Sequence, residues 1–262
     1  MCRWIAYRGD AIALEQYVTA PAHSLVVQSL RALESTGSTN GDGFGLGWYG
    51  EHDEPGLYRE VRPAWSDENL RHVCRHIRSH LFFAHVRAST GTSITRPNCH
   101  PFTHGRWMFM HNGLIGDWAL IRRKVEMLIP DAFYSARAGT TDSEAVFLAI
   151  LGAGADADPV GATLRTLATL AALVKESGTT QPLRFTSALS DGRDLYAFRY
   201  ANIGAANTLY YREARDSVVV VSEPLDTERD CWKPVPPGHV IVAKAGKPVE
   251  LAAFLKERLA AT

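Results

Sequence analysis

The chain has 262 residues, of which 46% are hydrophobic and 21% are charged, a composition typical of a globular protein with one large core or two modest ones. The 28 basic and 28 acidic side chains cancel, which argues against nucleic acid or an anionic membrane surface as a partner. The N-terminal segment has no apolar signal-peptide core, no apolar stretch reaches membrane-spanning length, and the four cysteines form no CxxC pair. Together these features predict a reduced, cytoplasmic protein.

The chain opens with MCRWIAYRGD, in which CRWIAYRG (2–9) is expected to be extended and a cysteine at position 2 directly follows the initiator methionine. A terminal position is a poor place for a reactive thiol without a purpose. Chance is one explanation. The other is that Met1 is removed, which would leave Cys2 with both its thiol and a free α-amine.

The stretch that follows predicts a helix between buried strands. GFGLGWYGE (43–51) indicates a glycine-bearing strand, and the spacing of apolar residues in SDENLRHVCRHIRSH (66–80) favours a capped helix. LFFAHVRAS (81–89) is a continuous apolar run, which indicates a strand buried on both faces. RWMFMHNGLI (106–115) predicts another such strand, which enters an Asn-Gly turn.

The second half of the chain predicts helices and then strands again. TDSEAVFLAIL (141–151) indicates a helix so uniformly apolar that it should be buried, and 158–178 indicates a longer helix. LRFTSALSDGRDLYAFRY (183–200) predicts a hairpin with an Asp-Gly turn, and further strands are expected at 207–212, 217–224 and 238–246. This order indicates an α+β fold with two sheets and helices outside. No linker divides the chain convincingly, so residues 1–262 are expected to form one domain.

Three short stretches carry the candidate chemistry: FAHVRASTG (83–91), MHNGLIGD (110–117) and GTTDSEAVF (139–147). Each has a structural explanation, since an arginine can end a strand in solvent, Asn-Gly favours a turn, and Thr141 with Glu144 fits a helix capping box. Combined with Cys2, however, they supply what a thiol needs to attack an amide: a base, an oxyanion hole and side chains that bind the substrate. A terminal α-amine, with a pKa of about 7.7–8.0, can move the proton of the thiol.

The remaining roles can be assigned to named side chains. The Asn112 side-chain amide and the Gly113 backbone N–H can stabilise a developing oxyanion. Arg87, with Thr90 beside it, can bind an α-carboxylate through both branches of its guanidinium, and Asp142 can bind an α-ammonium. Side chains that bind an α-carboxylate and an α-ammonium together specify an amino-acid head group. The attacked group would then be the side-chain amide of that amino acid.

Cys2 behind Met1, followed by HVRAST, HPF, HNG and TDSE in this order, resembles the glutaminase domain of class II glutamine amidotransferases, which are N-terminal-nucleophile hydrolases. The resemblance implies a four-layer αββα sandwich of two mainly antiparallel sheets with helices outside. It makes Cys2 the nucleophile and the carrier of the base, and it places the oxyanion hole at Asn112 and Gly113. The residues it implies for substrate binding are Arg87, Thr90, Asp142 and His85. The motif histidines are expected to orient loops through hydrogen bonds: His85, His100 and His111.

The activity implied by this resemblance is hydrolysis of the side-chain amide of glutamine through a cysteine thioester, with no metal or other cofactor. The later SEPLD (222–226) and WKPVPPGHVIV (232–242) resemble stand-alone members, among them the γ-glutamyl hydrolase of ergothioneine biosynthesis. Two alternatives therefore stay open: a hydrolase of γ-glutamyl amides on a larger metabolite, and a non-catalytic glutamine-sensing subunit. For a glutaminase, the acceptor of the released ammonia stays open, and a separate protein could take the ammonia up.

Two further patterns and one further cysteine compete with these assignments. His72, Cys74 and His76 could suggest zinc, but Cys74 falls on the apolar stripe of the predicted helix, which favours a solvated basic face for the two histidines. GLGWYG (45–50) matches a dinucleotide-binding pattern, but no helix is predicted after it. The glycines of the overlapping GDGFGLG (41–47) are expected to let the backbone pass close to another layer or to a ligand. Cys99 is the next candidate nucleophile after the terminal one.

Overall fold

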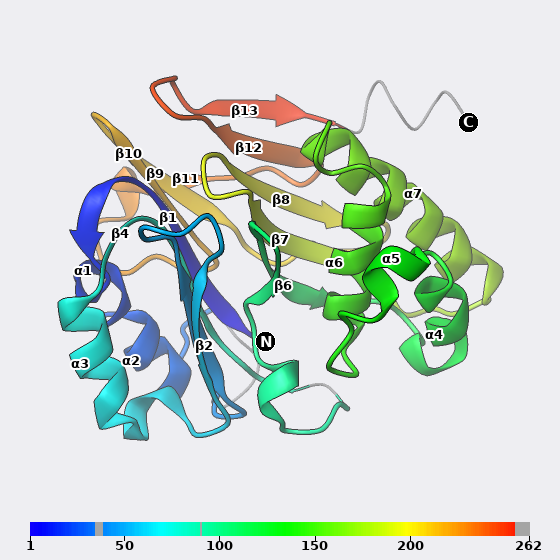
Figure 1. Cartoon of the computed structure of the whole chain (residues 1–262), viewed down its shortest axis with the longest axis horizontal. Helices are drawn as coiled ribbons and strands as arrows, with labels where there is room; N and C mark the ends of the chain where they lie inside the picture. Colours follow the sequence, from blue (N-terminus) through cyan, green and yellow to red (C-terminus); the bar gives the residue numbers. More distant parts are fainter. Residues whose placement is uncertain (35–38, 90, 255–262) are drawn as a thin grey trace.

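The structure is a computed structural model that describes residues 1–34, 39–89 and 91–254, and it arranges them in four layers (Figure 1). Two antiparallel sheets face one another in the middle. Helices from residues 15–76 cover the outer face of the first sheet, and helices from residues 118–176 cover the outer face of the second. This arrangement confirms the predicted α+β sandwich with two sheets between layers of helices.

The first sheet is built around the long initial strand. Within the described residues its seven strands lie in the order β11 (Lys233–Pro234), β9 (Tyr210–Ala214), β10 (Ser217–Val221), β1 (Arg3–Ala13), β4 (Arg78–Val86), β2 (Phe44–Trp48) and β3 (Gly56–Glu60). The helices on its outer face are α1 (Glu15–Val18), α2 (Leu25–Leu30) and α3 (Glu68–His76), with a short 3₁₀ turn at Ala64–Ser66. Since β1 is paired on both sides, the N-terminus is held at the end of a central strand.

The second sheet joins the later strands to the longer helices. Its six described strands lie in the order β13 (Glu250–Ala253), β12 (His239–Ala243), β8 (Leu195–Ala201), β7 (Arg184–Ser190), β6 (Trp107–Leu114) and β5 (Phe102–His104). Its outer face is covered by α4 (Trp118–Glu126), α5 (Asp131–Tyr134), α6 (Asp142–Gly152) and α7 (Pro159–Glu176). Short 3₁₀ turns also occur at Arg96–Asn98 and Arg229–Cys231. As its apolar sequence predicts, α6 is buried along almost its whole length.

Strand alternation decides which side chains face the space between the sheets. In β1, Trp4 and Ala6 belong to the inter-sheet core, whereas Ile5 and Tyr7 face the helices. The glycines of β2 allow the two sheets to approach, because a Cβ on Gly47 would lie 2.3 Å from the Sδ of Met108. The predicted close approach to another layer is therefore confirmed. The GxGxxG match, in turn, lies in a strand followed by β3 rather than by a helix.

The structure corrects two local predictions. The helix expected over 66–80 ends at His76, because the chain becomes extended at Ile77 and residues from Arg78 onward pair with β1. The turn expected at Asn112–Gly113 is wrong, since β6 runs on to Leu114 and pairs there with β7. In both places a strand partner far away in the sequence overrides the local signal.

A buried ion pair fixes the start of β1. The Arg3 Nε donates to the Glu223 Oε2 at 2.8 Å, and the Arg3 Nη1 donates to the backbone oxygen of Cys2 at 3.0 Å. The Glu223 carboxylate also accepts from His23 and from the backbone N–H groups of Leu33 and Glu34. Burial raises the pKa of the Glu223 carboxyl, but these hydrogen bonds and the charge of Arg3 outweigh it and lower the pKa to about 2.

The stability of the fold should depend on Glu223 in a defined acidic window. Because its pKa is lowered in the folded protein, the carboxylate stabilises the fold above its usual pKa of 4.5, and this contribution is lost as the pH falls toward 2. At neutral pH the contribution is about 3 kcal/mol by linkage. In urea unfolding experiments, the Glu223→Gln variant should be less stable at pH 7, and its free energy of unfolding should vary less between pH 4.5 and 2. The exposed Glu51→Gln is the control, and an unchanged pH dependence in Glu223→Gln would contradict the assignment.

Candidate active site

A cavity of about 130 Å³ opens at one end of the two sheets, where the chain begins. Four of the predicted elements meet there: the start of β1, the segment after β4, the end of β6 and the first turn of α6. Of the predicted site residues, the structure brings together five: Cys2, Arg87, Asn112, Gly113 and Asp142. Thr90 lies outside the described residues, and His85 lies behind the cavity wall.

Strand alternation explains how three of these side chains reach the same space. Cys2 comes two positions before Trp4 of β1, so its side chain points to the same face, toward the other sheet. In the same way, Asn112 follows Met108 and Met110 of β6 in steps of two residues and points to the inter-sheet face. On β4, Leu81 and Phe83 face the inter-sheet core, and the same two-residue alternation directs the side chain of Arg87 toward the space between the sheets. Three strands from two sheets thus converge on one end of the sandwich (Figure 1).

The Cys2 thiol is held by the backbone of the segment after β4. Its Sγ lies 3.4 Å from the N and 3.5 Å from the O of Ala88. Burial raises the pKa of the thiol, although the Ala88 hydrogen bond and the positive charges of the N-terminus and Arg87 oppose this effect. A thiol with a raised pKa is protonated at neutral pH, so it needs a nearby base to become a nucleophile.

Asn112 offers the cavity an unused hydrogen-bond donor. It is 3% exposed, and its Oδ1 accepts a hydrogen bond from the Nδ2 of Asn207 at 3.2 Å. Its own Nδ2 is buried and has no hydrogen-bond partner among the described residues. Because an unpaired buried N–H is costly, such a group is a candidate for binding a ligand or a transition state.

Gly113 occupies a position that has no room for a side chain. A Cβ there would lie 2.0 Å from the backbone oxygen of Arg184 and 2.1 Å from the Nε2 of His111. The glycine therefore lets β6 and β7 stay paired beside the cavity while the ring of His111 passes close to the backbone.

Arg87 is a buried cation whose charge is not matched by a carboxylate of the residues that the structure describes. The side chain is 3% exposed, and its guanidinium donates to the Thr92 Oγ1 at 2.6 Å, the Ser89 Oγ at 3.2 Å and the Asp42 backbone oxygen at 3.4 Å. No carboxylate of the described chain lies within ion-pair distance of it. These neutral contacts hold the guanidinium in place and leave its charge to an anionic ligand.

Asp142 occupies the first turn of α6, and Thr141 is the N-cap of this helix. Its Oδ1 accepts from the backbone N of Ser143 at 2.7 Å, and its Oδ2 accepts from the backbone N of Ile115 at 3.2 Å. These bonds tie the helix start to the end of β6. The carboxylate remains half-buried at the cavity wall, where it can bind a cation.

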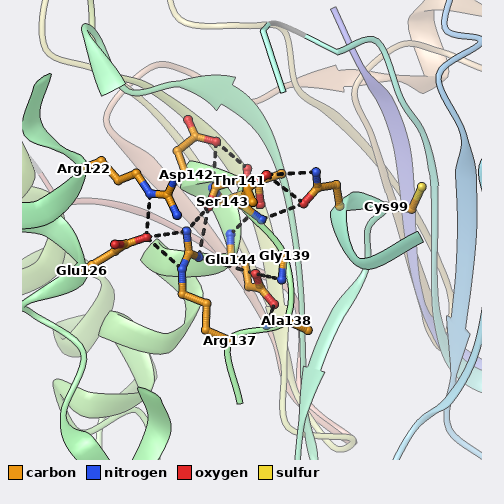
Figure 2. A network of polar contacts seen from close by, with 12 residues as sticks. Cys99, Arg122, Glu126, Arg137, Ala138, Gly139, Thr141, Asp142, Ser143 and Glu144 are labelled. Atoms are coloured by element: carbon orange, nitrogen blue, oxygen red, sulfur yellow. Dashed lines mark hydrogen bonds and ion pairs between the residues drawn. The ribbon is translucent and has the colours of Figure 1, made fainter. Parts of the chain in front are cut away.

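The segment before α6 is held by a buried charge network (Figure 2). Both terminal nitrogens of Arg137 donate to the Thr141 backbone oxygen at 3.2 Å, and Nη2 lies 2.9 Å from Glu126. The Glu144 carboxylate accepts from the backbone N–H groups of Ala138 at 2.9 Å and Gly139 at 2.7 Å. The Thr141 half of the predicted capping box is present, but Glu144 closes the preceding loop instead of the cap itself.

Asn98 links the two loops that carry the charged groups. Its Oδ1 accepts from the backbone N of Thr140 at 2.8 Å, and its Nδ2 donates to the backbone oxygen of Ser93 at 2.9 Å. Because it is 1% exposed, this link is shielded from water. It connects the loop that follows Arg87 to the segment that leads into Asp142.

The three motif histidines lie behind the cavity or in its wall and are neutral. Burial lowers the pKa of His85 to about 3, and it lowers the pKa values of His100 and His111 as well. The rings of His85 and His100 stack with their centroids 4.2 Å apart, and His85 Nε2 faces the His111 backbone oxygen at 3.3 Å. The His111 Nε2 donates to the Arg184 carbonyl at 3.1 Å, so its Nδ1 accepts from the Ser143 hydroxyl at 2.9 Å.

The other candidate residues lie elsewhere. Cys74 is buried in the core under α3, whereas His72 and His76 are exposed on the opposite side of that helix. Within the part of the chain that the structure describes, no three His, Cys, Asp or Glu side chains are grouped to hold a metal ion. The Cys99 Sγ contacts the backbone oxygens of Glu60 and Thr95 at 3.5 Å and does not line the cavity.

Asn207 and Arg184 are among the side chains of the cavity wall that sequence reasoning missed. The sequence pattern places both only in predicted strands, at 207–212 and 183–200. The side-chain Nε of Arg184 is buried without a hydrogen-bond partner among the described residues. No local signal distinguishes these two from ordinary strand residues, because their place in the site comes from tertiary contacts.

Comparisons with known proteins agree with this architecture. A family model described as class-II glutamine amidotransferases matches residues 18–211, a span that contains Arg87, Asn112 and Asp142 but not Cys2. The probable glutamine amidotransferase DUG3 of Saccharomyces cerevisiae is 32% identical over 295 residues, covering 93% of this chain and 82% of that protein. The gamma-glutamyl-hercynylcysteine sulfoxide hydrolase of Mycolicibacterium smegmatis is 29% identical, covering 92% and 95% respectively. A solved glutamine aminotransferase class-II domain protein from Silicibacter pomeroyi is 39% identical, with a TM-score of 0.77 over 97% of this chain and 99% of that one.

Substituting Gly113 should disturb the cavity wall. In Gly113→Ala the new methyl group must displace the Arg184 backbone or the His111 ring, which should cost about 1–3 kcal/mol of stability, as other overpacked sites do. The matched control is Gly50→Ala, where a Cβ would meet nothing within 4 Å and the change should stay within about 0.5 kcal/mol. Urea unfolding of both variants tests this, and equal stability of the two would refute the crowding argument.

Proposed function

The chain belongs to the class II glutamine amidotransferases, and from this premise we propose that it hydrolyses the side-chain amide of glutamine through a thioester on Cys2. The observation that carries the proposal is the buried Nδ2 of Asn112, which has no hydrogen-bond partner in the described part of the chain and lies in the wall of the cavity that Cys2 also lines. A donor in that position suits an oxyanion that forms when the thiol attacks a carbonyl carbon.

The mechanism begins with removal of Met1, which gives Cys2 a free α-amine. An α-amine with a pKa of about 7.7–8.0 is a suitable base for a thiol whose own pKa is raised by burial. The bond from the Arg3 Nη1 to the Cys2 backbone oxygen, at 3.0 Å, keeps the new first residue in the sheet. The amine and the thiol then belong to one anchored residue.

Acylation and deacylation follow from this arrangement. The Sγ attacks the amide carbon, and the carbonyl oxygen becomes an oxyanion that accepts from the Nδ2 of Asn112 and the backbone N–H of Gly113. When the C–N bond breaks, the leaving nitrogen takes the proton that the α-amine received from the thiol, and ammonia departs. Water then attacks the thioester, which releases glutamate and restores the thiol of Cys2.

Charged groups in the wall of the cavity select the glutamyl head. The guanidinium of Arg87, which has no carboxylate partner among the described residues, binds the α-carboxylate. The carboxylate of Asp142 binds the α-ammonium group. A substrate gripped at both charges is oriented with its side chain directed at the thiol, which lowers the entropic cost of reaction.

A second substrate class is favoured by the similarity to the gamma-glutamyl-hercynylcysteine sulfoxide hydrolase, which extends over 92% of this chain. In that case the same head-group contacts hold a γ-glutamyl amide, and an amine larger than ammonia leaves. For glutamine as substrate, a separate protein is proposed to take up the ammonia.

The proposed place of action is the cytoplasm, as the sequence predicts. All four cysteines are free thiols in the structure. No helix of the described residues is long and apolar enough to cross a membrane.

Processing and nucleophile identity can be tested together. The intact mass of an active preparation should lack one methionine, because the mechanism needs the α-amine of Cys2. Cys2→Ala should abolish amide hydrolysis while the thermal unfolding temperature stays close to that of the wild type. Cys99→Ala is the matched control and should retain activity, since its thiol lies outside the cavity. An active Cys2→Ala variant, or full activity with Met1 retained, would disprove this mechanism.

The substrate class can be decided by comparing kcat/KM for glutamine with that for a panel of N-substituted γ-glutamyl amides. We expect glutamine to be used at least as well as the substituted amides. A preference of a hundredfold or more for an N-substituted substrate, about 2.7 kcal/mol of transition-state binding, would replace the glutaminase assignment with the γ-glutamyl hydrolase assignment.

A further inference from the structure

Asn207 lies beside Asn112 in the wall of the cavity. It is 7% exposed, and its Nδ2 lies 3.1 Å from the backbone oxygen of Asn112 and 3.2 Å from the Asn112 Oδ1. Asn207 belongs to the segment between β8 and β9, 95 positions further along the chain, so only the tertiary fold creates this contact.

These two contacts determine how both amides are oriented. A backbone carbonyl can only accept, so the atom of Asn207 that faces it must be the Nδ2. The same Nδ2 faces the side chain of Asn112, which must therefore present its Oδ1 there. As a consequence, the Nδ2 of Asn112 is directed away from Asn207, and it is the buried donor that has no partner among the described residues.

The second sheet holds Asn207 itself in place. The Nε of Arg199, on β8, donates to the Asn207 backbone oxygen at 2.8 Å, and its Nη2 donates to the Ala206 backbone oxygen at 3.3 Å. The hydroxyl of Thr186, on β7, also reaches the Asn207 oxygen at 3.4 Å. Residues of two paired strands, β7 and β8, thus anchor the segment that carries Asn207.

We propose that Asn207 is a positioning residue that keeps the donor face of the Asn112 amide turned toward the oxyanion of the reaction. This inference rests on the function proposed above. If the Asn112 amide rotated by half a turn, its Oδ1 would face the oxyanion and repel it. Because that oxyanion exists only in the transition state, losing the orientation should lower kcat and leave KM nearly unchanged.

The isosteric variant Asn207→Asp tests the orientation directly. A carboxylate only accepts hydrogen bonds, so it should draw the Nδ2 of Asn112 toward itself and away from the cavity. We expect kcat for the amide substrate to fall about 100-fold, the loss typical of one oxyanion donor, with KM within about threefold. Asn207→Ala adds no charge and removes both hydrogen bonds to Asn112, so its kcat should fall about two- to tenfold.

A double-mutant cycle separates positioning from an independent role. If Asn207 acts through Asn112, the variant Asn112→Ala/Asn207→Asp should be no slower than Asn112→Ala alone, within about threefold. Effects that multiply in the double variant would show that Asn207 acts on its own and would overturn the proposal. A kcat of Asn207→Asp within threefold of the wild type, or a rise in KM alone, would also overturn it.

The matched control is Asn202→Asp, in the same connecting segment but outside the cavity. Its Oδ1 accepts from the backbone N of Leu183 at 2.8 Å, a role that a carboxylate preserves, so its kcat should match the wild type. Thermal unfolding of each variant establishes that the compared proteins are folded. If Asn207→Asp does not fold, Asn207→Ala takes its place in the comparison.

A crystal structure of Asn207→Asp, or of Asn207→Ala in its place, supplies a readout that needs no turnover. In the charged variant the Asn112 Nδ2 should lie within hydrogen-bond distance of the new carboxylate, and in the alanine variant the Asn112 amide should lose its single orientation. An Asn112 amide that keeps its wild-type orientation in the crystal contradicts the proposal. A wild-type enzyme that hydrolyses no γ-amide contradicts the proposed function instead, and the crystallographic test still decides the role of Asn207.

Discussion

The central place of β1 in the first sheet is the constraint on which the site depends. Most chain termini fray, but here the first strand is paired on both sides, and the buried pair of Arg3 with Glu223 holds its first residue. Arg3 also donates to the backbone oxygen of Cys2. A reactive group at position 2 is thereby placed as firmly as a core side chain, and the inward phase of the strand directs it between the sheets.

The site differs from its surroundings in what it leaves unsatisfied. The loops around it are closed by buried contacts, such as Arg137 with Glu126 and the Thr141 carbonyl (Figure 2). Asn98 adds a further buried contact with Thr140. At the cavity itself, neither the Nδ2 of Asn112 nor the charge of Arg87 is matched by the described residues: the first has no hydrogen-bond acceptor there and the second no carboxylate. A rigid frame around unpaired polar groups is how a fold prepares a site for charge that appears only with substrate.

Burial also separates the roles of the nearby titratable groups. It lowers the pKa values of the histidines next to the cavity, so these rings are neutral at physiological pH. The stacked rings of His85 and His100 stiffen this part of the structure and add no positive charge to it. The same burial raises the pKa of the Cys2 thiol, which makes the proposed α-amine base necessary.

The sequence alone determined the layered α+β fold, the buried α6 and most of the strands, because apolar periodicity and helix caps are local properties. It also pointed to Cys2, Arg87, Asn112, Gly113 and Asp142, since each residue type suits one step of amide chemistry. Tertiary structure decided what local signals could not. It extended β6 through Asn112–Gly113 where the dipeptide favours a turn, because β7 supplies a strand partner there. It also brought Asn207 to Asn112 from 95 positions away, and no local pattern encodes the side-chain orientation that this distant contact imposes.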